Sequence, residues 1–352
     1  MTNYEEKLVS VVIASYNTPP KFLCEAVDSI VNQTYYNIEI IIIDDCSDTP
    51  CKEVLSIYED KRIKIFRNKE NLGVTKSRNI ALDKCNGEYI AIMDADDISM
   101  PERIEKQVEY LEKNKDVFVL GTKTYLLEDD KLYKKDIYIP KSRERYQCWL
   151  FFDNSRYITH PSAMLRSSMI KKYGIKYNEK YKKALDYGLW VECVKYGKCR
   201  ILNEYLLKYR IHKNQITSLN RSEQIYFADQ ICLDQIANLG IDITDEEKKV
   251  HLALRDSEKY NDMKSTKLWI EKIILKNNEK KVYDVNEFKK EIDYRWFKLC
   301  YKEYRKTKDK ETAIELCKSL NINNITRSIQ FVILNKIINK KKRVKDNLAN
   351  KC

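Results

Sequence analysis

Short apolar runs alternate with amphipathic stretches through the first half of the chain. Four of these runs, each rich in β-branched residues, predict buried strands. They cover residues 8–14, 38–43, 63–66 and 89–93. The amphipathic stretches between the runs predict helices, which cover about 20–31, 52–58 and 74–83. Strands that alternate with helices favour a parallel sheet with right-handed crossovers, so we expect an α/β fold.

The pattern changes in the second half of the chain. Residues 117–120 predict one more strand, and the signal then weakens. Past residue 222 the chain is heavily charged with apolar positions at helical spacing, and Thr244 followed by acidic residues marks a helix start. We therefore expect two regions, an α/β domain over residues 1–221 and an α-helical C-terminal region with a basic tail over residues 222–352.

Polar residues follow these strands, and the fourth strand runs straight into Asp94-Ala95-Asp96-Asp97. Carboxylates at the end of a buried strand are costly unless a cation neutralises them. In an open α/β sheet that end is also where ligands bind. A divalent metal that bridges these carboxylates and the phosphates of a ligand fits both observations. The alternative is a solvated acidic turn in which Asp97 or Ser99 caps the helix after Pro101.

Charge and hydropathy limit the partners that we expect. The chain carries a formal charge of +12, densest over Lys336–Lys351, where it follows the apolar segment 329–334. A basic, partly apolar helix suits an anionic membrane surface, and a solvated tail is the alternative. No nucleic-acid motif accompanies the charge, so nucleic acid is not expected. Without a signal peptide or an apolar run of membrane-spanning length, a cytoplasmic protein is expected, with the tail allowing a peripheral position at the inner face of the plasma membrane.

The cysteines do not indicate a zinc site or a disulfide framework. The 11 cysteines are scattered without a Cys-x-x-Cys pair, and three histidines accompany them. Such spacing is typical of reduced thiols that pack as small hydrophobic residues.

Five motifs now follow one another along the chain. They are Ala14-Ser15-Tyr16-Asn17, Asp44-Asp45-Cys46-Ser47, the segment 71–79, the Asp94 cluster and Leu185-Asp186-Tyr187-Gly188-Leu189-Trp190. Together they closely resemble the inverting glycosyltransferases of family 2, of the bacterial glycan-assembly type, over about residues 9–217. The resemblance implies a GT-A fold for residues 1–221, which is a Rossmann-like, mostly parallel sheet flanked by helices, with the C-terminal helices as an appendage.

The resemblance also implies a nucleotide-sugar donor site on the loops after the strands. Its residues are Ala14, Tyr16, Asn17, Asp45, Asn71, Gly73, Arg78, Asp94 and Ala95. The Tyr16 ring would stack on the base, and Asp45 would accept a hydrogen bond from the imide of a uracil ring. Other roles stay open. Tyr16 could stack in the core, Asn17 or Asp45 could cap a helix, and Arg78 could be a surface charge.

The acidic cluster matches the Asp-x-Asp motif of that family. The resemblance makes Asp96 the direct ligand of Mn²⁺ or Mg²⁺, with Asp94 directed at the ribose or reaching the metal through water. The metal would offset the charge that builds on the diphosphate as the sugar–phosphate bond breaks. In Tyr209-Arg210-Ile211-His212, His212 could be a third ligand or touch the diphosphate, or it could make a structural hydrogen bond. The role of Asp97 is open.

Asp186 matches the catalytic base of the family, although many members have Glu-Asp where this chain has Leu185-Asp186. Inversion needs a base opposite the leaving group that takes the proton of the acceptor hydroxyl as it attacks. Trp190 lies one helical turn later and either walls the acceptor sugar or packs in the core. His160 falls in a stretch that matches the acceptor side of the family.

We therefore expect a hexosyl- or N-acetylhexosaminyltransferase that moves a sugar from a UDP-sugar to a hydroxyl of a growing surface glycan, such as lipopolysaccharide or capsule. The acceptor could be carried on a lipid. One alternative is a catalytically inactive protein that binds nucleotide-sugars or acts as a scaffold. Another is a sugar nucleotidyltransferase, which would need a glycine-rich basic loop after the first strand, and residues 14–20 do not supply one.

Overall fold

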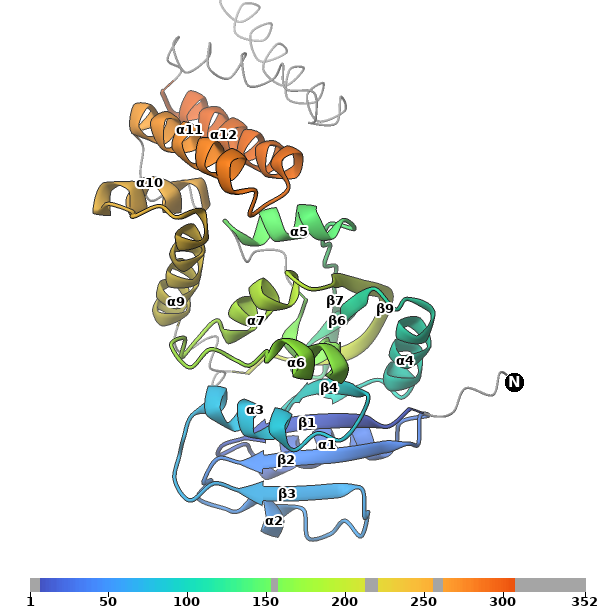
Figure 1. The fold of residues 1–352 in the computed structure, drawn as a ribbon. Coiled ribbons are helices and arrows are strands. Elements are labelled where there is room, and N and C mark those ends of the chain that lie inside the picture. The colour runs from blue at the N-terminus through green and yellow to red at the C-terminus, as the bar shows by residue number, and fades with distance from the viewer. Residues whose placement is uncertain (1–6, 153–157, 213–220, 256–261, 308–352) are drawn as a thin grey trace, which may run out of the picture. The chain divides into compact units, whose positions relative to one another are not determined.

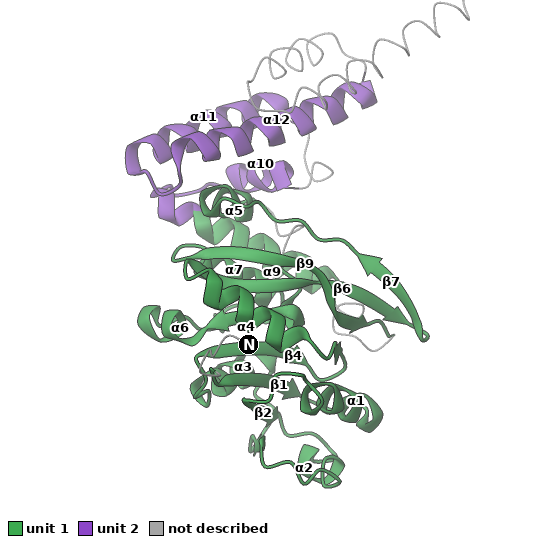
Figure 2. Ribbon diagram, turned by 90° about the vertical axis from the view of Figure 1, so that its right-hand side faces the viewer, with its two compact units in different colours: residues 1–235 green, residues 236–352 purple. Residues whose placement is uncertain are grey.

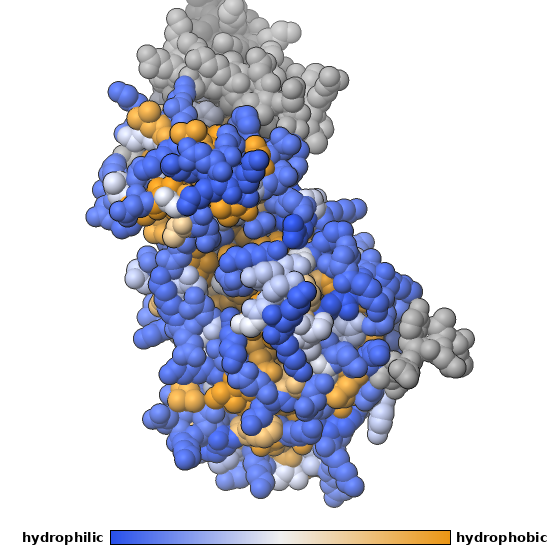
Figure 3. Space-filling view, viewed as in Figure 1, coloured by the Kyte–Doolittle hydropathy of each residue, from blue (hydrophilic) through white to orange (hydrophobic). Residues whose placement is uncertain are grey.

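The protein is described by a computed structural model that covers residues 7–152, 158–212, 221–255 and 262–307 (Figure 1). The chain divides into two units, residues 1–235 and residues 236–352 (Figure 2). Hydrophilic residues cover most of the face of the first unit that Figure 3 presents, in keeping with the 34% of charged residues in the sequence.

The four predicted apolar runs form neighbouring parallel strands, which confirms the α/β fold class. They are β1 (Val9–Ser15), β2 (Ile38–Asp44), β3 (Ile63–Arg67) and β4 (Tyr89–Asp94), in the spatial order β3-β2-β1-β4. The register pairs Ala14 with both Ile43 and Asp94, and Ser15 with Asp44. The carboxyl ends of the central strands therefore form one row, along which the polar loops begin.

Helices cover both faces of this parallel half (Figure 1). The apolar faces of α1 (Pro20–Val31) and α4 (Arg103–Lys113) pack in the core cluster that holds Val9, Val11 and Ile13 of β1. Helix α3 (Val74–Asp83) contacts β1 and β2 from the other side. Helix α2 (Cys51–Val54) is shorter than the helix expected over 52–58, because the chain turns back at Leu55.

The second half of the sheet is mixed rather than parallel. Strand β8 (Met164–Arg166) pairs antiparallel with β4 and β6 (Val117–Glu128), and β9 (Lys198–Arg210) runs parallel to β6. The two-residue β5 (Ile98–Ser99) pairs with β9, and β7 (Lys131–Lys135) forms a hairpin with β6. Asp129 and Asp130 have φ of 44° and 62° at this hairpin, the left-handed conformation that two-residue hairpin turns require.

The remaining helices of the first unit follow the weakly patterned part of the sequence. They are α5 (Arg143–Leu150), the 3-10 helix η1 (His160–Ser162), α6 (Ser167–Tyr173), α7 (Leu185–Cys193) and α9 (Arg221–Asp234). Helix α9 belongs to the first unit, although it lies almost wholly beyond the domain boundary that we expected at residue 221.

The second unit is helical over its described residues. Its elements are α10 (Asp245–Arg255), α11 (Met263–Lys280) and α12 (Val285–Thr307), preceded by the 3-10 helix η2 (Gln235–Leu239) at the boundary. Thr244 Oγ1 accepts a hydrogen bond from Glu247 N while Glu247 Oε2 accepts one from Thr244 N, a capping box that confirms the predicted helix start.

No helix in the described part of the chain is both long and apolar enough to cross a membrane. The basic tail and the apolar segment before it lie beyond residue 307, outside the described residues. The expected membrane contact and the expected cytoplasmic location therefore stay predictions.

A buried carboxylate joins three strands at the sheet edge opposite the polar loops. Glu39 on β2 accepts hydrogen bonds from Ser10 Oγ at 2.6 Å, Asn86 N at 2.8 Å and Lys64 Nζ at 2.8 Å. Burial raises the pKa of this carboxyl, but the hydrogen bonds from Lys64, Ser10 and Asn86 outweigh burial and lower the pKa to about 2. The ionised Glu39 carboxylate therefore stabilises the fold at every pH at which this carboxyl would also be ionised in the unfolded chain.

Replacing this carboxylate should destabilise the protein in a pH-dependent way. We expect Glu39→Gln to lower the free energy of unfolding at pH 7 by about 1–3 kcal/mol, because buried donors lose their acceptor. The depressed pKa means that the contribution is complete above the unfolded value of about 4.3 and is lost as pH falls toward 2. Urea denaturation at several pH values measures both effects.

Glu109→Gln is the matched control, because Glu109 is exposed and its ion pair is with Lys113 on the same helix. Its removal should change stability little. A Glu39→Gln protein as stable as this control at pH 7 would contradict the assignment.

Candidate active site

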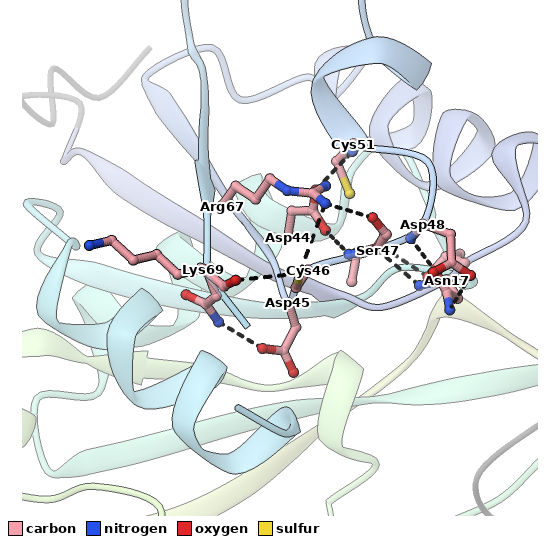
Figure 4. Close-up of polar contacts among 12 residues, drawn as sticks. Asn17, Asp44, Asp45, Cys46, Ser47, Asp48, Cys51, Arg67 and Lys69 are labelled. Atoms are coloured by element: carbon pink, nitrogen blue, oxygen red, sulfur yellow. Dashed lines mark hydrogen bonds and ion pairs between the residues drawn. The ribbon is translucent and has the colours of Figure 1, made fainter. Parts of the chain in front are cut away.

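The loops after β1 and β2 are fastened to each other by hydrogen bonds (Figure 4). Asn17, with φ of 50°, donates its backbone N–H to Ser47 Oγ at 3.0 Å, and its side-chain oxygen accepts from Asp48 N at 2.8 Å. The buried Asp44 accepts from Ser47 N, Cys51 N and Arg67 Nη1 at 2.7–3.0 Å. Asp44 therefore holds the β2 loop in shape.

The Tyr16 side chain projects from the fastened β1 loop. Its residue is 52% exposed, so the ring does not stack in the core. Ala14 lies at the end of β1 beside Asp94 in the register. An exposed aromatic ring at the carboxyl end of a central strand is available to stack on a flat ligand.

Asp45 organises the segment that leads into α3. It is 3% exposed, and its Oδ1 accepts hydrogen bonds from Asn68 Nδ2 at 2.8 Å and Leu72 N at 2.9 Å. Its Oδ2 accepts from Gly73 N at 2.8 Å. Gly73 has φ of 84°, which favours glycine, and its N–H also contacts Asn71 Oδ1 at 3.1 Å. A carboxylate can accept about four hydrogen bonds, so these three donors leave one acceptor position of Oδ2 unused.

Each carboxylate of the acidic cluster has a different partner. Arg78 Nη2 lies 2.6 Å from Asp94 Oδ1, and His212 Nε2 lies 2.9 Å from Asp96 Oδ2. Asp97 Oδ1 accepts from Arg210 N at 2.8 Å, while its buried Oδ2 has no hydrogen-bond partner among the described residues. The first two carboxylates are partly exposed at the strand end, and Asp97 fastens the end of β9.

Neither Asp97 nor Ser99 caps the following helix. The N-cap position of α4 is Glu102, which makes no side-chain capping bond, and Gln33 Oε1 accepts the hydrogen bond from Ile104 N instead. The alternative of an acidic capping turn is therefore wrong for this segment.

The carboxylates of the cluster raise one another's pKa values. Burial raises the pKa of the Asp94 carboxyl, and the charge of Asp96 raises it further against the opposing effect of Arg78. Burial, with Asp96 and Asp94 nearby, raises the pKa of Asp97 well above its usual range. A cation bound here would relieve this repulsion.

The side chains at this edge fit a divalent metal ion whose remaining coordination positions are filled by a bound ligand. Among the described residues no group of three or more His, Cys, Asp or Glu side chains is arranged to hold a metal. Mg²⁺ is commonly bound by one or two carboxylates together with substrate phosphates, so a protein cage of three ligands is not needed. Asp96 and His212, with Asp94 nearby, are the residues that would supply the protein ligands.

Arg78 lies between the acidic cluster and the next candidate residue. Its side chain is 15% exposed, so it is not a surface charge. Its guanidinium lies 5.8 Å from the centre of the Tyr177 ring, and its charge acts on both Asp94 and Asp186. One arginine thus offsets carboxylates on two elements.

Asp186 lies in the first turn of α7, after Ala184 with φ of 54°. Its Oδ1 accepts a hydrogen bond from Tyr187 N at 2.9 Å. Burial raises the pKa of this carboxyl, and the Tyr187 N–H, Arg78 and Lys135 oppose the rise. A partly buried aspartate with a raised pKa, on which two cations act, is a candidate general base.

Trp190 packs in the core. It is fully buried, and its Nε1 donates to Ile158 O at 3.2 Å. The core alternative is therefore confirmed for this residue, and it does not wall an acceptor pocket.

The end of β9 is fixed against α1 and the acidic cluster. Arg210 Nε donates to Asp96 O at 2.7 Å, and the guanidinium forms an ion pair with Glu25. The guanidinium also lies 4.3 Å from the centre of the Phe22 ring, which contacts His212 at 5.5 Å between ring centres. Arg210 and His212 therefore belong to the same edge as the acidic cluster.

Sequence reasoning missed the residues that support this edge. Phe22 and Glu25 lie within a helix that was predicted without a role, and Lys135 and Tyr177 lie where the pattern is weak. None of the four falls in a motif. Their roles follow from tertiary packing alone.

Comparison with known proteins bears on this arrangement. The sequence matches the family described as Glycosyl transferase family 2 over residues 10–174. An uncharacterized glycosyltransferase of Methanocaldococcus jannaschii is 38% identical over 231 residues, which cover 63% of this chain and 77% of that protein. The UDP-Glc:alpha-D-GlcNAc-diphosphoundecaprenol beta-1,3-glucosyltransferase WfaP of Escherichia coli is 30% identical over 220 residues, which cover 62% of this chain and 83% of WfaP.

A solved structure supports the fold. S. aureus TarS 1-349 in complex with UDP-GlcNAc superposes with a TM-score of 0.55 at 16% identity, covering 82% of this chain and 91% of that chain. At this identity the likeness concerns the fold, and it confirms the GT-A architecture with additional C-terminal helices. The relative of 38% identity, which is covered over 77% of its length, decides the assignment together with the family match, and we conclude that this chain belongs to glycosyl transferase family 2 and is a glycosyltransferase.

Proposed function

We propose that this glycosyltransferase moves a sugar from a UDP-sugar to a hydroxyl of a growing surface glycan, with inversion at the anomeric carbon. The observation that carries the proposal is the row formed by Asp45, the Arg78–Asp94 pair and Asp186. Asp45 would contact the nucleotide at one end, and the Arg78–Asp94 pair would lie by the diphosphate in the middle. Asp186 would act as the general base at the other end.

The proposal that the donor carries uridine rests on Asp45. Its carboxylate is held by three hydrogen bonds, so its orientation is set before a ligand arrives. The acceptor position that remains on Oδ2 suits the imide N–H of uracil, and Tyr16 lies on the neighbouring loop with its ring exposed. A base without that N–H would leave the carboxylate facing a lone pair.

The diphosphate would lie between the acidic cluster and the cations around it. We propose that Asp96 and His212, with Asp94, hold Mg²⁺ or Mn²⁺ there, which would offset charge on the diphosphate leaving group. Arg78 keeps Asp94 oriented at 2.6 Å, and Arg210 fixes the backbone of Asp96. These residues thereby keep the cluster in place when an anionic ligand enters.

Asp186 would perform the proton transfer. Its carboxylate takes the proton of the acceptor hydroxyl while that oxygen forms the new bond to C1 of the sugar. The bond between C1 and the phosphate oxygen breaks, and its electron pair leaves with UDP. The raised pKa makes Asp186 a better proton acceptor than an exposed aspartate.

The acceptor is proposed as a glycan carried on a lipid. WfaP, as its name states, transfers glucose to a GlcNAc-diphosphoundecaprenol, and the relation to it supports an acceptor of this class. The sequence of the basic tail is compatible with an anionic membrane surface near such an acceptor.

Removal of the proposed base tests the reaction. With Mn²⁺ and a panel of UDP-glucose, UDP-galactose and their N-acetylamino counterparts, we expect slow UDP release from at least one donor. Asp186→Asn should lower this rate by about 10²–10⁴-fold, because the proton acceptor is lost. Donor binding, followed by thermal shift, should persist, with about 2.7 kcal/mol of stabilisation at a hundredfold excess over Kd.

Asp83→Asn serves as the control, because Asp83 is exposed and pairs with Lys176 away from the row. Wild-type protein that neither binds nor cleaves any UDP-sugar would contradict the proposed function. UDP release by Asp186→Asn at the wild-type rate would contradict only the base assignment.

The pH dependence of UDP release should follow the raised pKa of Asp186. The base acts when ionised, so the rate at saturating donor should fall as pH decreases through a pKa above the ordinary value of about 3.9. Arg78→Met removes a cation that lowers this pKa, so the acid limb should move to higher pH. Arg78→Lys should leave the limb near its wild-type position, and a limb that moves to lower pH in Arg78→Met would refute the coupling.

Asp45→Asn should change which nucleobase the protein prefers in its ligand. The amide can donate a hydrogen bond to N3 of cytosine, which lacks the imide proton of uracil. We expect the affinity for UDP to fall about tenfold or more, and the ratio of UDP to CDP affinity to decrease. Isothermal titration with UDP and CDP measures this, and an unchanged ratio beside the Asp83→Asn control would exclude Asp45 from base recognition.

A further inference from the structure

His160 is a buried histidine at the edge of the candidate site whose role the proposed function leaves open. It lies in η1 and is 6% exposed. Its Nε2 lies 2.8 Å from the Tyr177 hydroxyl, and its Nδ1 lies 3.9 Å from Asp94 Oδ1. Nδ1 is buried and makes no hydrogen bond to any described residue. Buried polar atoms are rarely left without a partner, so the surroundings of this one need an explanation.

The neighbours of His160 hold its ring in one orientation. Tyr177 is fixed through its backbone, because its N–H donates to Asn79 Oδ1 at 2.8 Å and its carbonyl accepts from Asn79 Nδ2 at 2.9 Å. The Tyr177 hydroxyl then fixes Nε2, and the ring of Trp190 lies 6.0 Å from the imidazole centre. Rotation of the imidazole would break the bond to the Tyr177 hydroxyl.

The charge of Asp94 decides which nitrogen carries the proton. A lone pair on Nδ1 would face the carboxylate and be repelled by it, whereas an N–H in that position is attracted. The favoured neutral tautomer therefore has the proton on Nδ1, and the Tyr177 hydroxyl donates to Nε2. Asp94 Oδ1 thus pairs directly with Arg78 at 2.6 Å, while the N–H of His160, at 3.9 Å and beyond hydrogen-bond distance, acts on it by charge attraction.

Because it depends on the donor-binding role of Asp94 proposed above, this inference deepens that role. We propose that His160 is a positioning residue that orients the Asp94 carboxylate for the nucleotide donor through its Nδ1–H. Arg78 alone fixes one contact of Asp94 and leaves rotation about that contact possible. A second N–H group, placed from η1 on a different element, restricts that rotation without adding a charge.

Two substitutions separate the nitrogens of the ring. In His160→Asn the amide nitrogen can take the place of Nδ1, while His160→Gln extends to the place of Nε2 and loses the group that faces Asp94. We expect His160→Gln to weaken UDP binding in the presence of Mn²⁺ by about tenfold or more, and His160→Asn to stay within about threefold of wild type. Isothermal titration with UDP is the measurement.

The steady-state parameters should show which step is affected. UDP release at saturating UDP-sugar should change little in His160→Gln, because the surroundings of Asp186 are intact, while KM for the donor rises. A merely structural role would instead lower Tm and reduce kcat in both variants together. Equal UDP affinities in the two variants, whether both retained or both lost, would overturn the proposal.

Tyr177→Phe keeps the test decisive if either histidine variant does not fold. This variant retains the ring beside Arg78 and removes only the hydroxyl that fixes Nε2. We expect a smaller loss of UDP affinity, of about threefold to tenfold, at unchanged kcat, and an unchanged affinity would overturn the proposal. Failure of the wild-type protein to bind UDP would be a failure of the proposed function instead.

Discussion

Repulsion between carboxylates held away from water at one sheet edge is the constraint on which the rest of this site depends. Two unit charges about 6 Å apart repel by roughly 3 kcal/mol at an effective dielectric constant near 20. Asp94, Asp97 and Asp186 all have raised pKa values, with burial as the leading cause. Such an arrangement persists only because cations and N–H groups are built around it. A diphosphate ligand would add negative charge to the same edge, so its binding depends on the same cations and on any metal that enters with it.

Helix α3 supplies several of the groups that surround these carboxylates. Thr75, Arg78 and Asn79 lie on one face of the helix, at the three- and four-residue spacing that brings side chains together. Thr75 Oγ1 donates to Tyr181 O at 3.3 Å, Arg78 pairs with Asp94, and Asn79 binds the backbone of Tyr177 on both sides. The start of the same helix is held by Asp45 through Gly73 N. One helix therefore connects the loop that Asp45 organises to the segment that leads into α7.

Elements that depend on local sequence pattern could be predicted from the sequence, whereas elements that depend on distant contacts could not. The strands β1 to β4 are continuous apolar runs with helices between them, so local pattern suffices to predict them. The mixed half of the sheet could not be predicted in this way, because β8 has three residues and β5 has two. These short strands exist only through pairing with distant strands. Asp45, Asp94, Asp96 and Asp186 fall at motif positions, whereas Tyr177 and Lys135 reach the edge through folding that no local pattern records.

The segment around Asp186, the proposed general base, differs from the family pattern that the sequence resembles. The family pattern that the sequence resembles has a second acid before the proposed base in many members, and this chain has the buried Leu185 there. A second carboxylate at that position would raise the pKa of Asp186 further, against the opposing effect of Arg78 and Lys135. Lys135 comes from the hairpin strand β7, and burial lowers its own pKa while Asp186 opposes that change. Burial is the main cause of the raised pKa of Asp186, and the charges that oppose it come from α3 in the parallel half and from a hairpin in the mixed half.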